Sequence, residues 1–109
     1  MNERIIIAQG WLMDSENYTK EQLKENYIAA ATDDVNDNIK YGNYIAGAIV
    51  HACSATVNYY LSETISHSYS KYCVEHYAIE AVKFWLSEYF EATGENRQDY
   101  IDAVHKENK

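Results

Sequence analysis

Two cysteines and three of the four histidines are the first candidates for metal binding or nucleophilic chemistry. Cys53, Cys73, His76 and one of His51 or His67 would supply the thiolate and imidazole ligands that zinc prefers. On a helix, however, His51 and Cys53 point about 200° apart, and Cys73 and His76 form a single i, i+3 pair without a matching second pair. Nothing in the local sequence activates either thiol as a nucleophile. We therefore expect no metal site and no catalytic cysteine.

Carboxylates are the most numerous groups that could do chemistry. With 17 Asp and Glu in 109 residues, chance pairs are unavoidable, and acid–base catalysis would also need a cleft that holds two of them face to face. The four glycines, at positions 10, 42, 47 and 94, form no G-x-G phosphate loop. The sequence therefore predicts a protein that is not an enzyme and uses no cofactor.

The acids do form two strings that could bind a partner. They belong to two longer runs of acids, which are Glu21, Glu25, Asp33, Asp34 and Asp37 in the first half of the chain and Glu88, Glu91, Glu95, Asp99 and Asp102 in the second. We expect Asp33, Asp34 and Asp37, the first acidic string, and Glu88, Glu91 and Glu95, the second, to meet Lys and Arg of the partner. On a continuous helix the second string would share one face, with carboxylates about 5–6 Å apart, close to the spacing of nucleic-acid phosphates. The 11 tyrosines add amphipathic contact area of the kind enriched at protein interfaces. We expect three of them to be exposed and to contact the partner: Tyr41, Tyr44 and Tyr69.

The charge balance indicates the kind of partner. A net charge of −8 and a pI near 4.8 oppose binding to nucleic acid, which requires clustered Lys and Arg. The same charge steers the chain toward basic surfaces, such as the nucleic-acid channel of another protein.

The distribution of charge along the chain predicts the elements that position these residues. Residues 1–40 carry 8 acids and 4 bases, residues 41–70 carry one acid and no base, and residues 71–109 carry 8 acids and 5 bases. The chain has no proline and no Asn-Gly or Asp-Gly hairpin signal. We expect one acidic all-α domain, residues 1–109, with four or five helices packed around a neutral helix at residues 44–62.

Local signals mark the helix boundaries. Thr19 and Gln22 form a capping-box pattern that begins a helix, whose apolar positions are Leu23, Tyr27, Ile28 and Ala31. The serine-rich segment 62–70 predicts a break, after which Ser70 would cap a helix ending near Gly94. A last helix at residues 98–106 would bury Ile101 and Val104, and the segment 5–13 favours a helix over a strand.

Targeting signals are not evident in the sequence. The first 13 residues contain one basic residue and only a four-residue apolar run, Ile5–Ala8, which does not fit a signal peptide. The weakly charged segment 41–70 is interrupted by Asn, His, Ser and Thr, so it predicts a buried helix and not a membrane span. Two cysteines are too few for a secreted disulfide scaffold, and we expect a location in the cytoplasm of a bacterial host.

The segment Ala48–Ile65, with the Asp-rich segment Thr32–Asp37 before it, resembles the Ocr-type DNA-mimic restriction inhibitors of podophages. Members of that family are small, acidic, helical and dimeric, and they cover the DNA-binding groove of host restriction enzymes. The resemblance implies that Asp33, Asp34, Asp37 and Glu63 act as phosphate-like carboxylates and that the chain forms a homodimer.

Taken together, these observations predict a stoichiometric inhibitor that occludes a basic nucleic-acid-processing protein. A phage-encoded counter-defence protein, acting against restriction or CRISPR systems, fits this description. Two alternatives remain open. An immunity protein that neutralises a nuclease toxin would have the same size and acidity, and helices lined with Tyr, His and Asn could instead enclose a small polar ligand.

Overall fold

The computed structural model describes residues 1–107, which form six α-helices and two short 3₁₀ helices and contain no strand. The elements are α1 (Glu3–Met13), η1 (Ser15–Asn17), α2 (Lys20–Thr32), α3 (Asp34–Tyr41), α4 (Asn43–Asn58), η2 (Tyr59–Thr64), α5 (Ser68–Thr93) and α6 (Arg97–Glu107). The predicted all-α single domain is confirmed. There are more helices than the four or five expected, because the polar segment after Asp33 forms a separate helix before Gly42.

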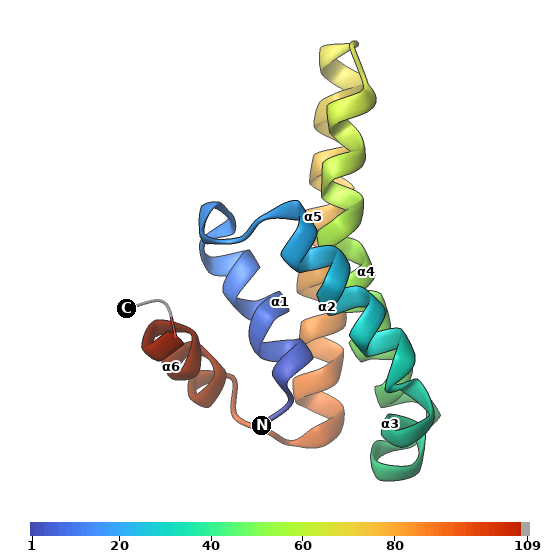
Figure 1. Cartoon of the computed structure of the whole chain (residues 1–109), viewed down its shortest axis with the longest axis vertical. Helices are drawn as coiled ribbons and strands as arrows, with labels where there is room; N and C mark the ends of the chain where they lie inside the picture. Colours follow the sequence, from blue (N-terminus) through green and yellow to red (C-terminus); the bar gives the residue numbers. More distant parts are fainter. Residues whose placement is uncertain (108–109) are drawn as a thin grey trace.

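A long hairpin of α4 and α5 forms the centre of the molecule (Figure 1). Helices α1 and α2 cover one side of this hairpin, α3 lies beside the start of α4, and α6 packs on α1. The core contains side chains from five helices, with Ile5, Trp11, Leu23, Ile49, Val82, Leu86 and Tyr100 all nearly inaccessible to solvent. No charged residue occurs in α4, which agrees with the prediction of a neutral central helix.

The end of the hairpin extends beyond α1 and α2 (Figure 1). We call residues 59–76 the arm; it comprises η2, the connecting residues and the first turns of α5. At its base, Trp11 Nε1 donates a hydrogen bond to Tyr60 Oη at 3.1 Å, and the Trp11 ring packs edge-on against Tyr59. Farther along, Ser62 is buried and donates to a Glu75 carboxylate oxygen at 3.0 Å. These contacts join the two helical segments of the arm to each other and to α1.

Several predicted boundaries are confirmed. Thr19 and Gln22 make both hydrogen bonds of a capping box, and Gly94 ends α5 in the left-handed conformation with φ of 72°. The predicted break lies between η2 and α5. Ser70 is not the cap of α5, because His67 takes that position and accepts a hydrogen bond from the Ser70 backbone N–H at 3.4 Å.

The buried face of α2 differs from the prediction. Leu23, Asn26 and Ala30 are buried, whereas Tyr27 and Ile28 are exposed. Asn26 explains the difference, because its Nδ2 donates to the carbonyl of Arg4 at 3.2 Å and contacts Cys53 Sγ at 3.3 Å. A polar residue that hydrogen-bonds α1 therefore turns α2 by about one position from its most apolar face.

The buried face of α6 also differs in part from the prediction. Val104 is buried as predicted, but Tyr100 is buried in place of Ile101.

Gly10 of α1 gives a direct test of this packing. A Cβ atom at this position would lie 1.9 Å from Tyr18 Oη and 2.7 Å from Tyr18 Cζ, so the ring must move. We expect Gly10→Ala to lower the free energy of unfolding by about 1–3 kcal/mol, measured by urea denaturation.

Gly47→Ala is the matched control, because no atom lies within 4 Å of a Cβ atom at this position in α4. Alanine has the higher helix propensity, so Gly47→Ala should raise the stability by about 0.5–1 kcal/mol. Equal effects of the two substitutions would show that Tyr18 does not require glycine at position 10.

Candidate functional site

The first acidic string lies where α2 meets α3. Asp33 joins the two helices, and Asp34 and Asp37 lie in the first turn of α3, where the helix dipole favours negative charge. Partial burial raises the pKa of Asp37, and the neighbouring carboxylates of Asp33 and Asp34 raise it further, while Lys40 opposes them. The chain therefore holds three carboxylates together although their mutual repulsion is unfavourable.

The second string is only partly a single helix face. Glu88 and Glu91 lie on the last turns of α5, as predicted, but α5 ends at Thr93 and Glu95 follows the turn at Gly94. Glu88 accepts a hydrogen bond from the hydroxyl of Tyr44, at the start of α4. This bond, with the nearby negative charge, raises the pKa of Tyr44. Glu91 is exposed.

Glu95 belongs to a hydrogen-bonded cluster with two buried tyrosines. One of its carboxylate oxygens accepts from Tyr89 Oη at 2.9 Å and also from Tyr100 Oη. Tyr100 Oη in turn accepts from the backbone N–H of Asn2 at 2.9 Å. Burial raises the pKa of both tyrosines, and the bond to Glu95 adds to this effect, so that the pKa of Tyr100 reaches about 12. In this structure Glu95 holds α5, α6 and the N-terminus together.

The three predicted contact tyrosines lie at two ends of the molecule. Tyr41 is half-buried, with its ring edge-on to Tyr89 at 6.2 Å and the Lys40 ammonium group 5.0 Å from its centre. Tyr44 is exposed beside Glu88. Tyr69 is exposed on the arm, at the far end of α5 from Glu88 (Figure 1). Glu63, which the resemblance adds to the acidic set, is also in the arm and forms an ion pair with Lys20 at 3.5 Å.

The fold brings the two acidic strings to the same end of the molecule (Figure 1). Tyr41 and Tyr44 connect them, because Tyr41 packs on Tyr89 of α5 and Tyr44 binds Glu88. A groove of about 300 Å³ between the end of α3 and the start of α6 also lies in this region, and its lining includes Asp99, from the longer second run of acids, together with Lys40. We call Asp33, Asp34, Asp37, Glu88, Glu91 and Asp99 the acidic end.

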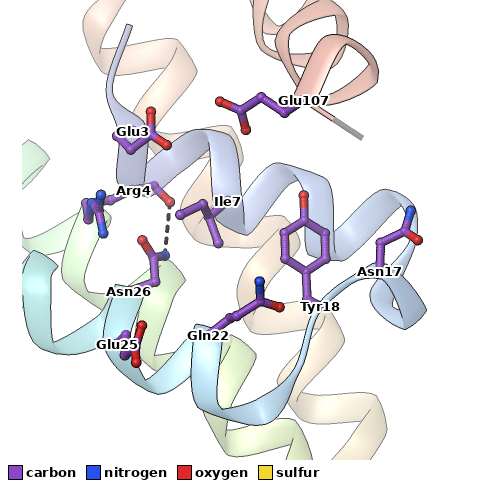
Figure 2. A pocket seen from close by; sticks show the side chains of 9 residues that line it. All are labelled: Glu3, Arg4, Ile7, Asn17, Tyr18, Gln22, Glu25, Asn26 and Glu107. Atoms are coloured by element: carbon purple, nitrogen blue, oxygen red, sulfur yellow. Dashed lines mark hydrogen bonds between the residues drawn. The ribbon is translucent and has the colours of Figure 1, made fainter. Parts of the chain in front are cut away.

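A second concave site was not predicted from the sequence. It is a cleft of about 390 Å³ between α1, α2 and the end of α6 (Figure 2). Figure 2 shows Glu3, Arg4 and Ile7 on one wall and Gln22, Glu25 and Asn26 on the other, with Tyr18 at one end and Glu107 above. Asn26 Oδ1 is buried and has no hydrogen-bond partner within residues 1–107. Since the same side chain joins α2 to α1, its first role is structural.

The two cysteines lie in different environments, with Cys53 buried and Cys73 partly exposed. Among the described residues, no three His, Cys, Asp or Glu side chains are grouped so that they could hold a metal ion. Burial raises the pKa of Cys53 to about 12, which keeps the thiol protonated at neutral pH. Across residues 1–107, no helix combines the length and the apolar character needed to span a bilayer.

The different environments of the two cysteines predict different reactivity. Cys53 is fully buried and Cys73 is partly exposed on α5. At pH 8 an aromatic disulfide reagent should therefore label one thiol per folded chain rapidly and both after denaturation. Cys73→Ser should remove the rapid phase. Rapid labelling of Cys53 in the folded Cys73→Ser variant would contradict its burial.

Partial burial of Asp37, together with repulsion from Asp33 and Asp34, predicts a gain in stability when its charge is removed. Asp37 lies three and four residues from Asp34 and Asp33, and each like-charged pair at this spacing costs about 0.2–0.5 kcal/mol. Because folding raises the pKa of Asp37, its charge destabilises the fold at neutral pH, and this cost disappears as the pH falls and the group is protonated. Asp37→Asn should raise the melting temperature at pH 7 but have little effect near pH 3.

Asp99→Asn is the control, since Asp99 lies in the first turn of α6, where its charge favours the helix. It should leave the melting temperature at pH 7 unchanged or lower it. A lower melting temperature for Asp37→Asn at pH 7 would contradict the repulsion.

Comparison with known proteins found no relative: no protein-family model matches the chain, and no curated protein or solved structure matches it significantly.

Proposed function

We propose that this protein is a non-enzymatic inhibitor that covers the basic nucleic-acid-binding surface of another protein, and that it serves as a phage-encoded counter-defence protein against restriction or CRISPR systems. The observation that carries the proposal is the acidic end, where carboxylates from α3, α5 and α6 are gathered in a chain of net charge −8. The resemblance of residues 48–65 to Ocr-type inhibitors agrees with this function.

The acidic end has three features that suit a basic partner. Asp33 and Glu91 are exposed and can meet Lys or Arg of a partner. Tyr44 is more than half exposed beside Glu88 and supplies rigid contact area next to the charges. Rows of carboxylates on a rigid helical scaffold also resemble the phosphates that such a partner normally binds.

Binding through these charges should be sensitive to salt. We expect tagged protein to capture a restriction, CRISPR or nuclease subunit from a bacterial lysate and to release it as the salt concentration rises. Replacing Asp33 and Asp34 with Asn and Glu91 with Gln should weaken binding to the purified target about tenfold or more at low salt and flatten its salt dependence.

The matched control replaces Glu16, Glu21 and Glu25 with Gln, which makes the same change in net charge on exposed positions of η1 and α2. This control should retain most of the affinity. Equal loss in the two triple variants would show that total charge matters and that the acidic end is not the binding surface. A target that proves to be a secreted nuclease toxin would instead favour an immunity protein.

A further inference from the structure

The cleft between α1, α2 and the end of α6 is separate from the acidic end (Figure 2). None of the residues that form the acidic end lines it. Its volume is about 390 Å³, and small-molecule sites in proteins commonly measure roughly 300–1,000 Å³. Most of the side chains along its walls are polar or charged, so a molecule that fits the cleft must itself be polar.

A buried acceptor without a partner lies at one end of this cleft. Asn26 is 1% exposed, and its Oδ1 has no hydrogen-bond partner within residues 1–107. Nδ2 of the same amide donates to the Arg4 carbonyl and contacts Cys53 Sγ, so the amide cannot rotate without losing these contacts. Figure 2 shows the amide pointing from α2 across the cleft toward α1. Because buried polar groups are almost always paired, the position of Oδ1 indicates that an N–H donor binds here.

Charges of both signs lie at the same end of the cleft. Arg4 is partly buried and forms no ion pair within residues 1–107. Glu25, next to Asn26 on α2, is exposed and likewise forms no ion pair in this part of the chain. A guanidinium group binds carboxylates, and a carboxylate together with an amide oxygen binds an ammonium group. We call Arg4, Glu25 and Asn26 Oδ1 the head-group end.

We propose that this cleft binds a free α-amino acid with a basic side chain. Its carboxylate binds the Arg4 guanidinium group, and its α-ammonium group donates to Asn26 Oδ1 and pairs with Glu25. The two groups of the ligand thus provide a partner for the unpaired cation and for the unpaired acceptor. Since Oδ1 is buried, the Arg4 side chain must turn toward the carboxylate to let the ammonium group reach this oxygen.

The rest of the cleft indicates the side chain of the ligand. Tyr18 closes the far end, where its ring lies against Gly10. Gly10 lies about 9 Å along α1 from Arg4, which leaves room for an extended side chain. Ile7 lies between these two residues and can contact methylene groups, while the carboxylate of Glu107 lies above (Figure 2). A chain of methylene groups that ends in a cation, as in lysine, matches both features.

Isothermal titration calorimetry of the purified chain with L-lysine tests the proposal without any target protein. One molecule should bind per chain, with a dissociation constant of about 1 mM or lower. L-lysine should bind at least about fivefold more tightly than pentane-1,5-diamine, which has two ammonium groups but no carboxylate. Simple attraction to a chain of net charge −8 would favour the diamine instead, because it is the more highly charged cation.

A lysine residue of another protein offers the same side chain without the head group. Nα-acetyl-L-lysine amide represents this case, because it lacks both the α-ammonium group and the carboxylate. It should bind at least about fivefold more weakly than L-lysine. Equal binding of the two compounds would assign the cleft to a protein side chain and overturn the proposal.

Two variants assign the ends of the ligand. Arg4→Gln should weaken L-lysine binding at least about fivefold but should not weaken binding of the diamine, because the lost cation contacts only a carboxylate. Glu25→Gln should weaken the binding of both compounds. Glu91→Gln is the matched control, since it makes the same change in net charge at an exposed position of α5 outside the cleft, and it should leave L-lysine binding unchanged. Circular dichroism confirms that each variant is folded.

Nuclear magnetic resonance gives a direct readout at the unpaired acceptor. The side-chain NH₂ signals of Asn26 should shift as L-lysine is added, because Oδ1 gains a donor. The proposal is overturned if L-lysine does not bind at millimolar concentrations, if the diamine binds at least as tightly, or if Glu91→Gln weakens binding as much as Glu25→Gln. Since no target protein is present, such a failure would leave the function of the acidic end untouched.

Discussion

The packing of α5 against α4 is the contact on which the rest of the structure depends. Ala48, Ala52 and Ala55 of α4 are buried in the same cluster as Val82 and Leu86 of α5, and this pair of helices makes the most extensive contact in the described chain. Because α4 carries no charge, it can be surrounded on several sides without the cost of burying an ion. The hairpin also determines where the polar residues lie, since the start of α4 reaches the end of α5 and brings Tyr44 to Glu88.

At the same end of the hairpin, some acidic residues stabilise the fold and others destabilise it. Glu95 accepts hydrogen bonds from Tyr89 and Tyr100, and Tyr100 reaches Asn2, so one carboxylate links α5, α6 and the N-terminus. Asp37 shows the opposite arrangement, because partial burial and then its acidic neighbours destabilise its charge. Charges that reduce stability often lie where a protein binds something else, which agrees with the function proposed for the acidic end.

Local sequence signals predicted much of the fold, whereas contacts between distant residues decided what remained. The structure confirms three features that depend only on neighbouring residues. They are the capping box at Thr19, the break before the start of α5 and the glycine that ends α5. The face of α2 was wrong because Asn26, a polar residue, is buried through a hydrogen bond to α1. For the acidic residues, helical spacing predicted that Glu88 and Glu91 share a face. It could not predict that α3 lies at the same end of the molecule as Glu88 and Glu91, or that the Glu95 carboxylate accepts hydrogen bonds from Tyr89 and Tyr100.

The length of the arm has a consequence for the dynamics of the hairpin. Near Ile49 and Leu86 the two helices are enclosed by the core, whereas toward Thr64 and Ser68 the hairpin extends beyond α1 and α2 and its other support is the exposed Lys20–Glu63 ion pair. Backbone amides near Leu86 should therefore exchange with solvent only when the whole domain unfolds, and those near the tip should exchange through local opening. Helix α5 alone would then report both processes, as a gradient of protection along a single continuous helix.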